Sequence, residues 1–217
     1  MNVNNLSLNN TVLNAFIAEL RNVDVQRDAM RFRRNLERTG EIMAYELSRT
    51  LTYRSSKIQT PLASMEVNLI ANDIVIGTVF RAGLPFHNGF LNFFDHAENA
   101  FVSAFRKYRD NEKFDIEIEY IAAPNLKGKT LILADTMLAT GLSFELALQA
   151  LLTKGEPDQI HLCSVIASAP GIEYLQRKLN NLPVTLWCAA VDPELNEHAY
   201  IVPGLGDAGD LAYGLKL

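Results

Sequence analysis

Residues 130–143, TLILADTMLATGLS, decide the fold of this chain. Residues 131–134 form a continuous apolar run, which is typical of a strand buried on both faces of a parallel sheet. Asp135 follows this run, and open α/β sheets bind their ligands beyond the carboxyl ends of their strands. Small and hydroxyl-bearing residues come next, and then the helical pattern FELALQALLTKG begins. This order of strand, loop and helix predicts a ligand site at the edge of a parallel sheet.

The loop within this stretch has the properties of an anion site. Gly141 has no Cβ, so the backbone can approach an anion closely. The amides that open a helix point outward, and the helix dipole favours negative charge there. Thr140 and Ser143 add hydroxyl donors, so a terminal phosphate fits residues 139–143. From the residues alone, one alternative stays open: Thr140 is only a helix cap and Asp135 only a turn residue.

The rest of the chain alternates strands with helices. Other apolar runs bounded by turn residues lie at 64–70, 73–80, 100–106, 160–167 and 184–191, and helical patterns lie at 84–94, 142–153 and 170–180. Such repetition predicts an α/β fold with a parallel sheet and right-handed crossovers. Residues 113–121 alternate polar and apolar side chains, which predicts a strand with one wet face, at an edge or in a flap.

Both ends of the sequence differ from this pattern. Helices are expected over 11–23 and 27–50, the second interrupted or bent near Gly40. Five arginines lie within residues 27–38, either as an RNA or phosphate patch or as a solvated helix face or subunit contact. Interleaved acidic residues favour the second interpretation. Residues 192–217 form a glycine-punctuated stretch without a period, and long loops of this kind are usually functional.

Composition narrows the class of protein. The 217 residues suit one domain, and the net charge of −5 argues against a general nucleic-acid binder. No apolar run is long enough to span a membrane, and the start lacks the features of a signal peptide. Cys163 and Cys188 lie in apolar runs and are expected to be free thiols, which predicts a reducing, cytoplasmic location. The four histidines show no metal-ligand spacing.

Two motifs resemble a known family. DTMLATGLS, residues 135–143, resembles the phosphoribosyl diphosphate (PRPP) signature of type I phosphoribosyltransferases, and more narrowly the DPMLATGGS of uracil phosphoribosyltransferases. YIVPGLGDAGD, residues 200–210, is similar to the uracil-binding segment of that family, and shorter likenesses lie at 27–33, 81–84 and 189–198. The resemblance implies a single domain, 1–217, with a parallel sheet and helices on both faces. It also implies a base-binding hood made by the helical N-terminal segment and residues 192–217.

The resemblance implies roles for individual residues at the PRPP end. Arg81 would meet the diphosphate, as an arginine fork suits that leaving group. A second arginine on a closing loop aligns with Arg106, which we favour over Arg109. Asp135 would bind the ribose hydroxyls. The whole segment for ribose and 5-phosphate is Asp135, Thr136, Met137, Leu138, Ala139, Thr140, Gly141, Leu142 and Ser143.

At the base end, the resemblance places Asp207 near the anomeric carbon and the magnesium of the diphosphate. The main chain of Ile201, Gly206 and Ala208, beside Asp207, would read uracil. Mg²⁺ is expected to be held mainly by diphosphate oxygens and water, with no protein side chain assigned to it. The implied catalytic residues are Asp207, Arg106 and Arg81.

Three positions depart from the family pattern. Thr136 replaces a proline, which restores an amide donor, and Leu142 replaces a glycine, so its side chain must point away from the phosphate. Leu211 stands where a basic residue is common, which puts an ion pair at that corner in doubt.

The implied activity is the conversion of uracil and PRPP to UMP and diphosphate by a homo-oligomeric enzyme. Three alternatives stay open: a phosphoribosyltransferase for another base, a regulatory protein that binds PRPP or UMP together with RNA, and a non-catalytic relic. The tail motif argues against the first. The acidic balance and the single short arginine cluster argue against the second.

Overall fold

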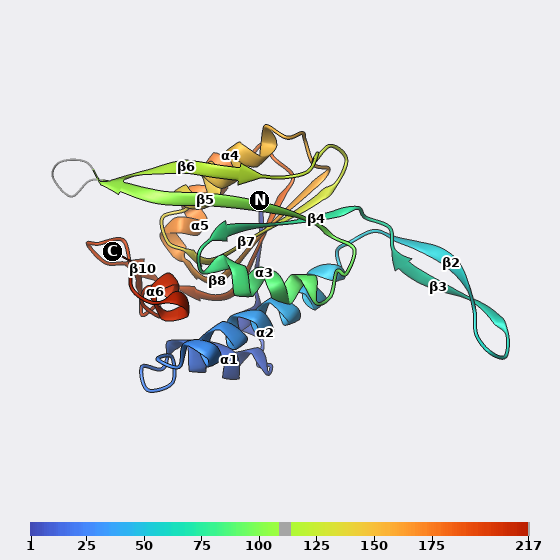
Figure 1. Ribbon diagram of the computed structural model, residues 1–217, viewed down its shortest axis with the longest axis horizontal. Coiled ribbons are helices and arrows are strands. Elements are labelled where there is room, and N and C mark those ends of the chain that lie inside the picture. The colour runs from blue at the N-terminus through green and yellow to red at the C-terminus, as the bar shows by residue number, and fades with distance from the viewer. Residues whose placement is uncertain (109–113, 217) are drawn as a thin grey trace.

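A computed structural model of the chain describes residues 1–108 and 114–216. Its centre is a seven-stranded sheet with the order β1-β9-β8-β7-β4-β5-β6 (Figure 1). Neighbouring strands are parallel except β5 and β6, which pair antiparallel at one edge. The strands are β1 (Asn2–Asn5), β4 (Ile74–Phe80), β5 (Glu98–Tyr108), β6 (Phe114–Ala122), β7 (Thr130–Leu138), β8 (Gln159–Ser168) and β9 (Val184–Asp192). The predicted α/β class is therefore confirmed, as is the edge position for residues 114–121 of the predicted strand 113–121.

Helices cover both faces of the sheet (Figure 1). Along β7, Ile132 and Ala134 pack into the core on the side of α1, α2 and α3, whereas Leu131 and Leu133 pack on the side of α4 and α5. This alternation explains the continuous apolar run, because both faces of a central parallel strand are buried. The helices are η1 (Leu6–Leu8), α1 (Leu13–Arg21), α2 (Ala29–Ser48), α3 (Gly83–Leu91), α4 (Leu142–Leu152), α5 (Ala169–Lys178) and α6 (Ala208–Tyr213).

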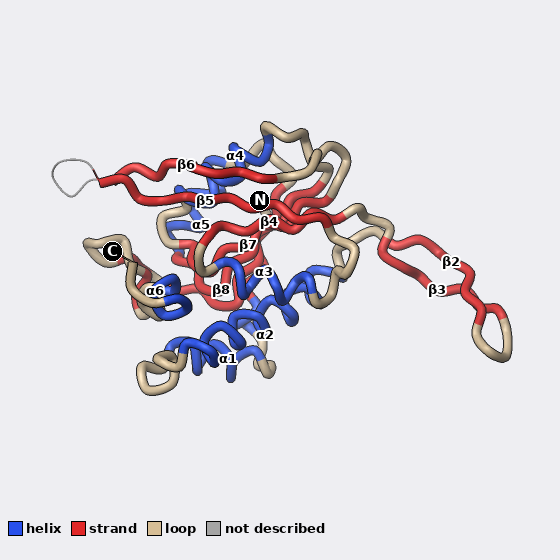
Figure 2. The backbone as a smooth tube through the Cα atoms, viewed as in Figure 1, coloured by secondary structure: helices blue, strands red, loops and turns tan. Residues whose placement is uncertain are grey.

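The apolar run at 64–70 does not belong to the central sheet. It is β3 (Ser64–Ile70), which pairs antiparallel with β2 (Tyr53–Gln59) in a hairpin that projects from the body (Figure 2). Its apolar residues alternate with Glu66 and Asn68, so only one face of the hairpin is apolar. The run is a strand, but it is not one of the parallel-sheet strands that the repetition predicts, and its alternation marks a strand with one polar face.

Helix α2 runs through Gly40 without the expected interruption. A Cβ at Gly40 would lie 2.3 Å from the Phe86 carbonyl oxygen, and one at Gly89 would lie 2.1 Å from the Glu37 carbonyl oxygen. The two glycines therefore let the backbones of α2 and α3 touch. Gly40 serves helix packing and does not end the helix.

The arginine cluster of residues 27–38 is largely paired within the chain. Arg34 forms an ion pair with Glu37 at 2.9 Å, and Arg31 forms one with Glu19 at 2.8 Å. Arg33 donates to the Ala212 carbonyl at 2.6 Å. These contacts favour the interpretation of the cluster as a helix face, and they argue against a phosphate-binding patch.

Candidate active site

A cleft with a volume of about 730 Å³ lies at the carboxyl edge of the sheet. Three segments form its walls: residues 79–82 after β4, residues 135–144 from β7 into α4, and residues 199–209 of the tail. Because β4 and β7 are parallel neighbours, their carboxyl ends meet at one edge. The tail lies across that edge, so the predicted PRPP segment and the predicted uracil segment face one cleft.

Strand β7 is longer than expected and carries the first part of the PRPP segment. The apolar run ends at Ala134, but β7 continues through Thr136 to Leu138. Asp135 is half-buried within it, and burial raises the pKa of this carboxyl group to about 7, although the amides of Thr136 and Met137 act to lower it. A carboxyl group with that pKa can accept or give up a proton near neutral pH.

Gly141 caps the start of α4 with a φ of +87°. A Cβ at this position would lie 2.8 Å from the Tyr174 ring and 3.2 Å from Leu175 Cγ, both on α5. The structure therefore adds a second reason for glycine, since left-handed backbone and the close approach of α5 both exclude a side chain. The Ser168 hydroxyl donates to the Ala139 carbonyl at 2.6 Å and steadies the same loop.

Every residue of the predicted segment 135–143 lines the cleft except Leu142. Leu142 is the first residue of α4 and stays half-buried away from the cleft. This placement agrees with the expectation that its side chain must point away from a phosphate. Thr136, the other departure, is buried within β7.

Arg81 follows β4 and reaches the tail. Its guanidinium donates to Asp210 Oδ1 at 2.8 Å and to the Gly214 carbonyl at 3.3 Å. A Cβ at Gly209 would lie 3.1 Å from the same guanidinium, so glycine leaves room for it. Leu211 replaces a basic residue, which put an ion pair next to Asp210 in doubt. Arg81 supplies the cation instead and forms that ion pair with Asp210.

Asp207 lines the same cleft as Asp135 and caps α6. Its carboxylate accepts from the Asp210 amide at 3.0 Å and forms an ion pair with Lys216 at 3.2 Å. Burial acts to raise the pKa of Asp207, but the hydrogen bonds from Asp210 and Lys216 outweigh it and leave the pKa lowered. The other predicted uracil-binding residues, Ile201, Gly206 and Ala208, line the cleft beside it.

The two candidate loop arginines are not placed in the cleft by the structure. Arg106 lies on β5, opposite Ile116 of β6, and its side chain is outside the described part of the molecule. Arg109 lies outside the described residues. Their assignment stays a prediction.

Several cleft residues were given no role by the sequence, although Ala82, Tyr200 and Gly209 lie within family-like stretches. Ser103 lies on β5 beside Phe80, next to a register shift between β5 and β6 that no local pattern reveals. Lys216 also belongs to the tail, but it comes after the motif of residues 200–210, so the motif did not indicate it. Tyr200 stands inside that motif and lines the cleft through its position beside Ile201. The complete set of cleft residues that sequence reasoning left out is Val79, Phe80, Ala82, Ser103, Phe144, Ala199, Tyr200, Gly209 and Lys216.

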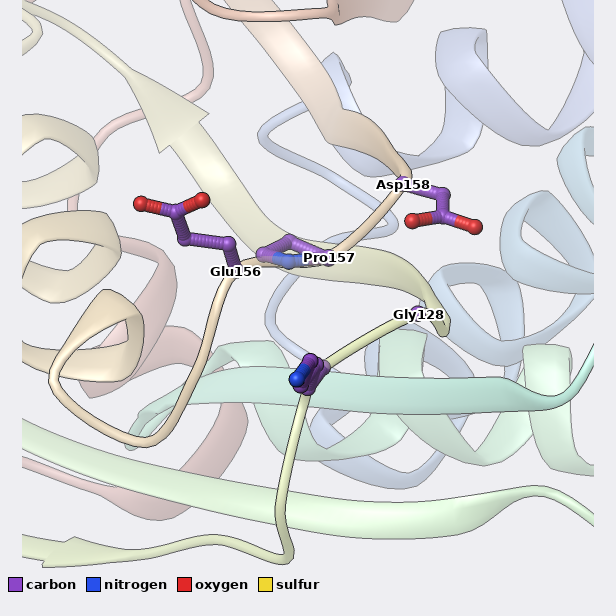
Figure 3. Close-up of a pocket in the computed structure, with 5 residues that line it drawn as sticks. Gly128, Glu156, Pro157 and Asp158 are labelled. Carbon is purple, nitrogen blue, oxygen red and sulfur yellow. The ribbon is translucent and has the colours of Figure 1, made fainter.

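A second hollow lies at the opposite edge of the sheet (Figure 3). It measures about 460 Å³ and is bounded by residues 127–128 and 156–158, which precede β7 and β8. Figure 3 shows the carboxylates of Glu156 and Asp158 pointing away from each other. The described residues hold no group of three histidine, cysteine or acidic side chains arranged for a metal ion. The carboxyl-edge cleft is therefore the better candidate site.

No helix within residues 1–108 and 114–216 is long and apolar enough to cross a bilayer.

Comparison with known proteins agrees with this geometry. The family model described as uracil phosphoribosyltransferase matches residues 7–214. A uracil phosphoribosyltransferase of Porphyromonas gingivalis is 54% identical over 217 residues, with all of both chains covered. One from Pyrococcus furiosus is 37% identical, covering 91% of this chain and 84% of its own.

A solved structure from Aquifex aeolicus, the AQ2163 protein, is also similar. It covers 99% of both chains with a TM-score of 0.86 and 28% identity. The resemblance drawn from the PRPP signature and the tail is thereby confirmed. With its two motifs brought to one cleft, and with relatives matched over their full length, this chain belongs to the uracil phosphoribosyltransferase family.

Proposed function

We propose that this protein converts uracil and PRPP to UMP and diphosphate, as a phosphoribosyltransferase of pyrimidine salvage. One observation carries the proposal: the PRPP segment 135–143 and the tail 199–209 line a single cleft. A phosphate bound at residues 139–143 and a base bound at the tail would leave the ribose between them, beside Asp135 and Asp207. That is the arrangement in which a base nitrogen can reach an anomeric carbon.

The chemistry asks the protein for positioning and charge stabilisation. The bond between the anomeric carbon and the diphosphate oxygen breaks, a bond from that carbon to uracil N1 forms, and N1 loses its proton. Positive charge develops on the ribose as diphosphate leaves, so the carboxylate of Asp207 would stabilise the ribose and Arg81 the leaving group. A half-buried carboxylate with a lowered pKa stays charged for this task at neutral pH.

Arg81 must change partners for this role. In the structure its guanidinium donates to Asp210 and to the Gly214 carbonyl. A diphosphate carries more charge than one carboxylate and accepts two parallel hydrogen bonds from an arginine fork. We therefore expect PRPP to displace Asp210 from Arg81.

Uracil recognition would rest on main-chain groups of the tail. The O4, N3–H and O2 of uracil present an acceptor, a donor and an acceptor, which a rigid loop can complement. Cytosine presents an amino group and an unprotonated N3, so the same loop would leave buried groups mispaired. Mispairing of that kind is an effective basis for discrimination.

Mg²⁺ fits the donor set of the cleft. Magnesium prefers oxygen ligands and commonly binds through one or two carboxylates together with substrate phosphates and water. Asp207 and Asp135 both offer carboxylate oxygens to this cleft. We propose that Asp207 contacts a magnesium ion carried by the diphosphate, which would neutralise charge on the leaving group.

We also propose that the protein is a homo-oligomer, with the β2–β3 hairpin as a contact between two copies. Ile58, Met65 and Leu69 lie on one face of the hairpin and are each about 40–50% exposed. An isolated two-stranded hairpin is marginally stable at best in water, so a covered apolar face would stabilise it. A second copy of the chain is the simplest cover, since most soluble oligomers are symmetric.

A cytoplasmic location is consistent with the state of the two cysteines. Cys163 and Cys188 are free and buried on neighbouring strands, and burial raises the pKa of the Cys188 thiol to about 12. Thiols of this kind are inert core residues typical of proteins from reducing compartments.

A panel of bases with radiolabelled PRPP tests the proposed function. Uracil should be converted to UMP, whereas cytosine, orotate and hypoxanthine should give little product. Efficient use of another base, or no product with any base, would contradict the proposal. A filter-binding assay with total RNA, run beside it, tests the regulatory alternative, which the internal pairing of the arginine cluster does not favour.

A further inference from the structure

An ion pair outside the cleft holds the base-reading tail in place. Arg21, the last residue of α1, and Asp192, the last residue of β9, form two parallel hydrogen bonds of 2.7 Å. The Asp192 side chain is only 6% exposed and that of Arg21 is 23% exposed. Neither residue lines the cleft.

The same two side chains bind the backbone of the tail at Gly204. The Gly204 amide donates to Asp192 Oδ2 at 2.8 Å, and the Gly204 carbonyl accepts from Arg21 at 2.9 Å. Both polar groups of this one residue are therefore satisfied by the ion pair. We call Arg21, Asp192 and Gly204 the tail clamp.

The clamp lies between the residues expected to read uracil. Gly204 comes three residues after Ile201 and two before Gly206, and its φ of +57° turns the chain between them. A Cβ at Gly204 would lie 2.1 Å from the Ile201 carbonyl oxygen, so this turn is tight. Any shift of Gly204 must move the main chain on both sides, where the base is expected to bind.

Asp192 links this loop to the seven-stranded sheet. It ends a central strand and pairs in register with Ser168 of β8, so its carboxylate has a position set by the sheet. Arg21 links the same loop to the N-terminal helix α1. Gln26 donates to the carbonyl of Leu205, the residue after Gly204, at 3.1 Å. The hydrogen bonds of the tail therefore lead back to both the sheet and the helical segment.

We infer that Arg21 and Asp192 are positioning residues for base recognition, which hold the main chain of residues 201–206 in the geometry that selects uracil. The inference rests on the proposed function. The two residues do not touch the PRPP segment, so their loss should act on the base and spare the other substrate. A purely structural role would instead lower stability without changing which base is used.

The test compares steady-state kinetics of the wild type, Asp192→Asn, Arg21→Lys and a matched control, Glu19→Gln. The control breaks a second two-bond ion pair of the same helical segment, between Glu19 and Arg31, which does not reach the tail. Asp192→Asn should raise the KM for uracil at least about ten-fold, the scale of one lost hydrogen bond to a charged group. The KM for PRPP should stay within about two-fold of the wild-type value, because no hydrogen bond to PRPP is lost. The ratio of kcat/KM for uracil to that for cytosine should fall.

Arg21→Lys keeps the charge but cannot form the two-bond fork, so it should raise the uracil KM less than Asp192→Asn does. Glu19→Gln should leave both KM values unchanged, whatever it does to the melting temperature. An unchanged uracil KM in folded Asp192→Asn would overturn the inference, as would an equal rise in the Glu19→Gln control. If Asp192→Asn does not fold, Arg21→Lys alone decides by the same two criteria. Wild-type turnover of uracil is measured first, so failure of the proposed function is recognised separately.

Discussion

Asp135 and Asp207 line the same cleft and have pKa values shifted in opposite directions. Burial raises the pKa of Asp135 to about 7, whereas hydrogen bonds from Asp210 and Lys216 keep the pKa of Asp207 low despite its partial burial. Pairs of titratable groups whose surroundings separate their pKa values are typical of sites with divided roles. Asp207 is then the permanently charged group, and Asp135 is the group that responds to pH.

Asp207→Asn should lower turnover about 100-fold, since it removes one electrostatic group from the reacting centre. Asparagine is as good a helix cap as aspartate, so α6 and the fold should survive. Steady-state kinetics with uracil and PRPP measure the effect, and circular dichroism checks the fold. Asp28→Asn is the matched control, because Asp28 caps α2 in the same way, accepting from the Arg31 amide at 3.0 Å away from the cleft. Near-normal turnover of Asp207→Asn would remove this residue from the catalytic set.

Asp135→Asn should change how stability depends on pH. A carboxyl group with a raised pKa binds its proton more tightly in the folded than in the unfolded chain between about pH 4 and 7. The free energy of unfolding contributed by Asp135 is therefore highest at low pH and falls as pH rises to about 7. The wild type should lose roughly 1–3 kcal/mol relative to Asp135→Asn between pH 5 and 8.

Urea unfolding of both proteins at several pH values measures this difference. His161 acts in the opposite direction, because burial lowers its pKa to about 4 and stability falls as its unfolded form takes up protons below about pH 6.5. Taking the difference between wild type and variant cancels that contribution. A difference that stays constant with pH would show that Asp135 is ionised as in water.

Arg106→Ala should impair catalysis more than Arg109→Ala, if the ungapped alignment of the loop is correct. The loss of a charge-assisted contact to the diphosphate corresponds to roughly 1.5–3 kcal/mol, or more than ten-fold in kcat/KM. Kinetics of both variants decide the question. The opposite order would move the loop arginine to Arg109.

Residue identities in the cleft were predictable wherever a local motif carries them. Asp135, Gly141 and Asp207 belong to short segments whose own sequence suggests a ligand, and the cleft contains all three. The contact between Arg21 and Asp192 could not be found in this way, since 171 positions separate the two residues, although Asp192 lies in the family-like stretch 189–198. The Arg81–Asp210 ion pair was missed for the same reason, because the cation comes from a different wall of the cleft.

At the scale of elements, the turn from β7 into α4 depends on its contact with α5. Gly141→Val should abolish binding of PRPP and UMP, because it changes the backbone that presents the phosphate amides. It should also lower stability by roughly 2 kcal/mol, since the added side chain meets Tyr174 and Leu175. Calorimetric titration and thermal unfolding measure the two effects.

Gly128→Val is the matched control for the turn. Gly128 also has a positive φ, +73°, but nothing lies within 4 Å of a Cβ built there. It should therefore show the backbone strain alone, with ligand binding intact. Retained binding of either phosphate ester by Gly141→Val would mean that residues 139–143 are not the phosphate site.

Elements were predictable where burial gives them a clear pattern. The strands β4, β7, β8 and β9 are continuous apolar runs because helices cover both of their faces. Strand β1 has the sequence NVNN, and its place in the sheet follows only from pairing with β9. Helix α6 has six residues, too few to show a helical period.

At the scale of the whole molecule, the hairpin gives the test of oligomeric state. Met65→Glu/Leu69→Glu places charge on its apolar face and should reduce the mass measured by sedimentation to that of one chain. Gln59→Glu/Asn68→Glu adds the same charge to the opposite face and should leave the mass unchanged. A single-chain mass for the wild type, or a double variant on the apolar face that keeps the oligomer, would contradict the proposed contact.

The tail clamp also has a consequence for synthesis on the ribosome. Residues 79–82 and 135–144 are synthesised long before residues 199–216. The ion pair of Arg21 with Asp192 cannot form until Asp192 has been synthesised. A nascent chain therefore carries the phosphate loop before any residue that could read a base. A messenger cut near codon 190 would encode a product with the PRPP segment and no uracil wall. Such a product would also lack Asp192, so Arg21 would have no carboxylate partner.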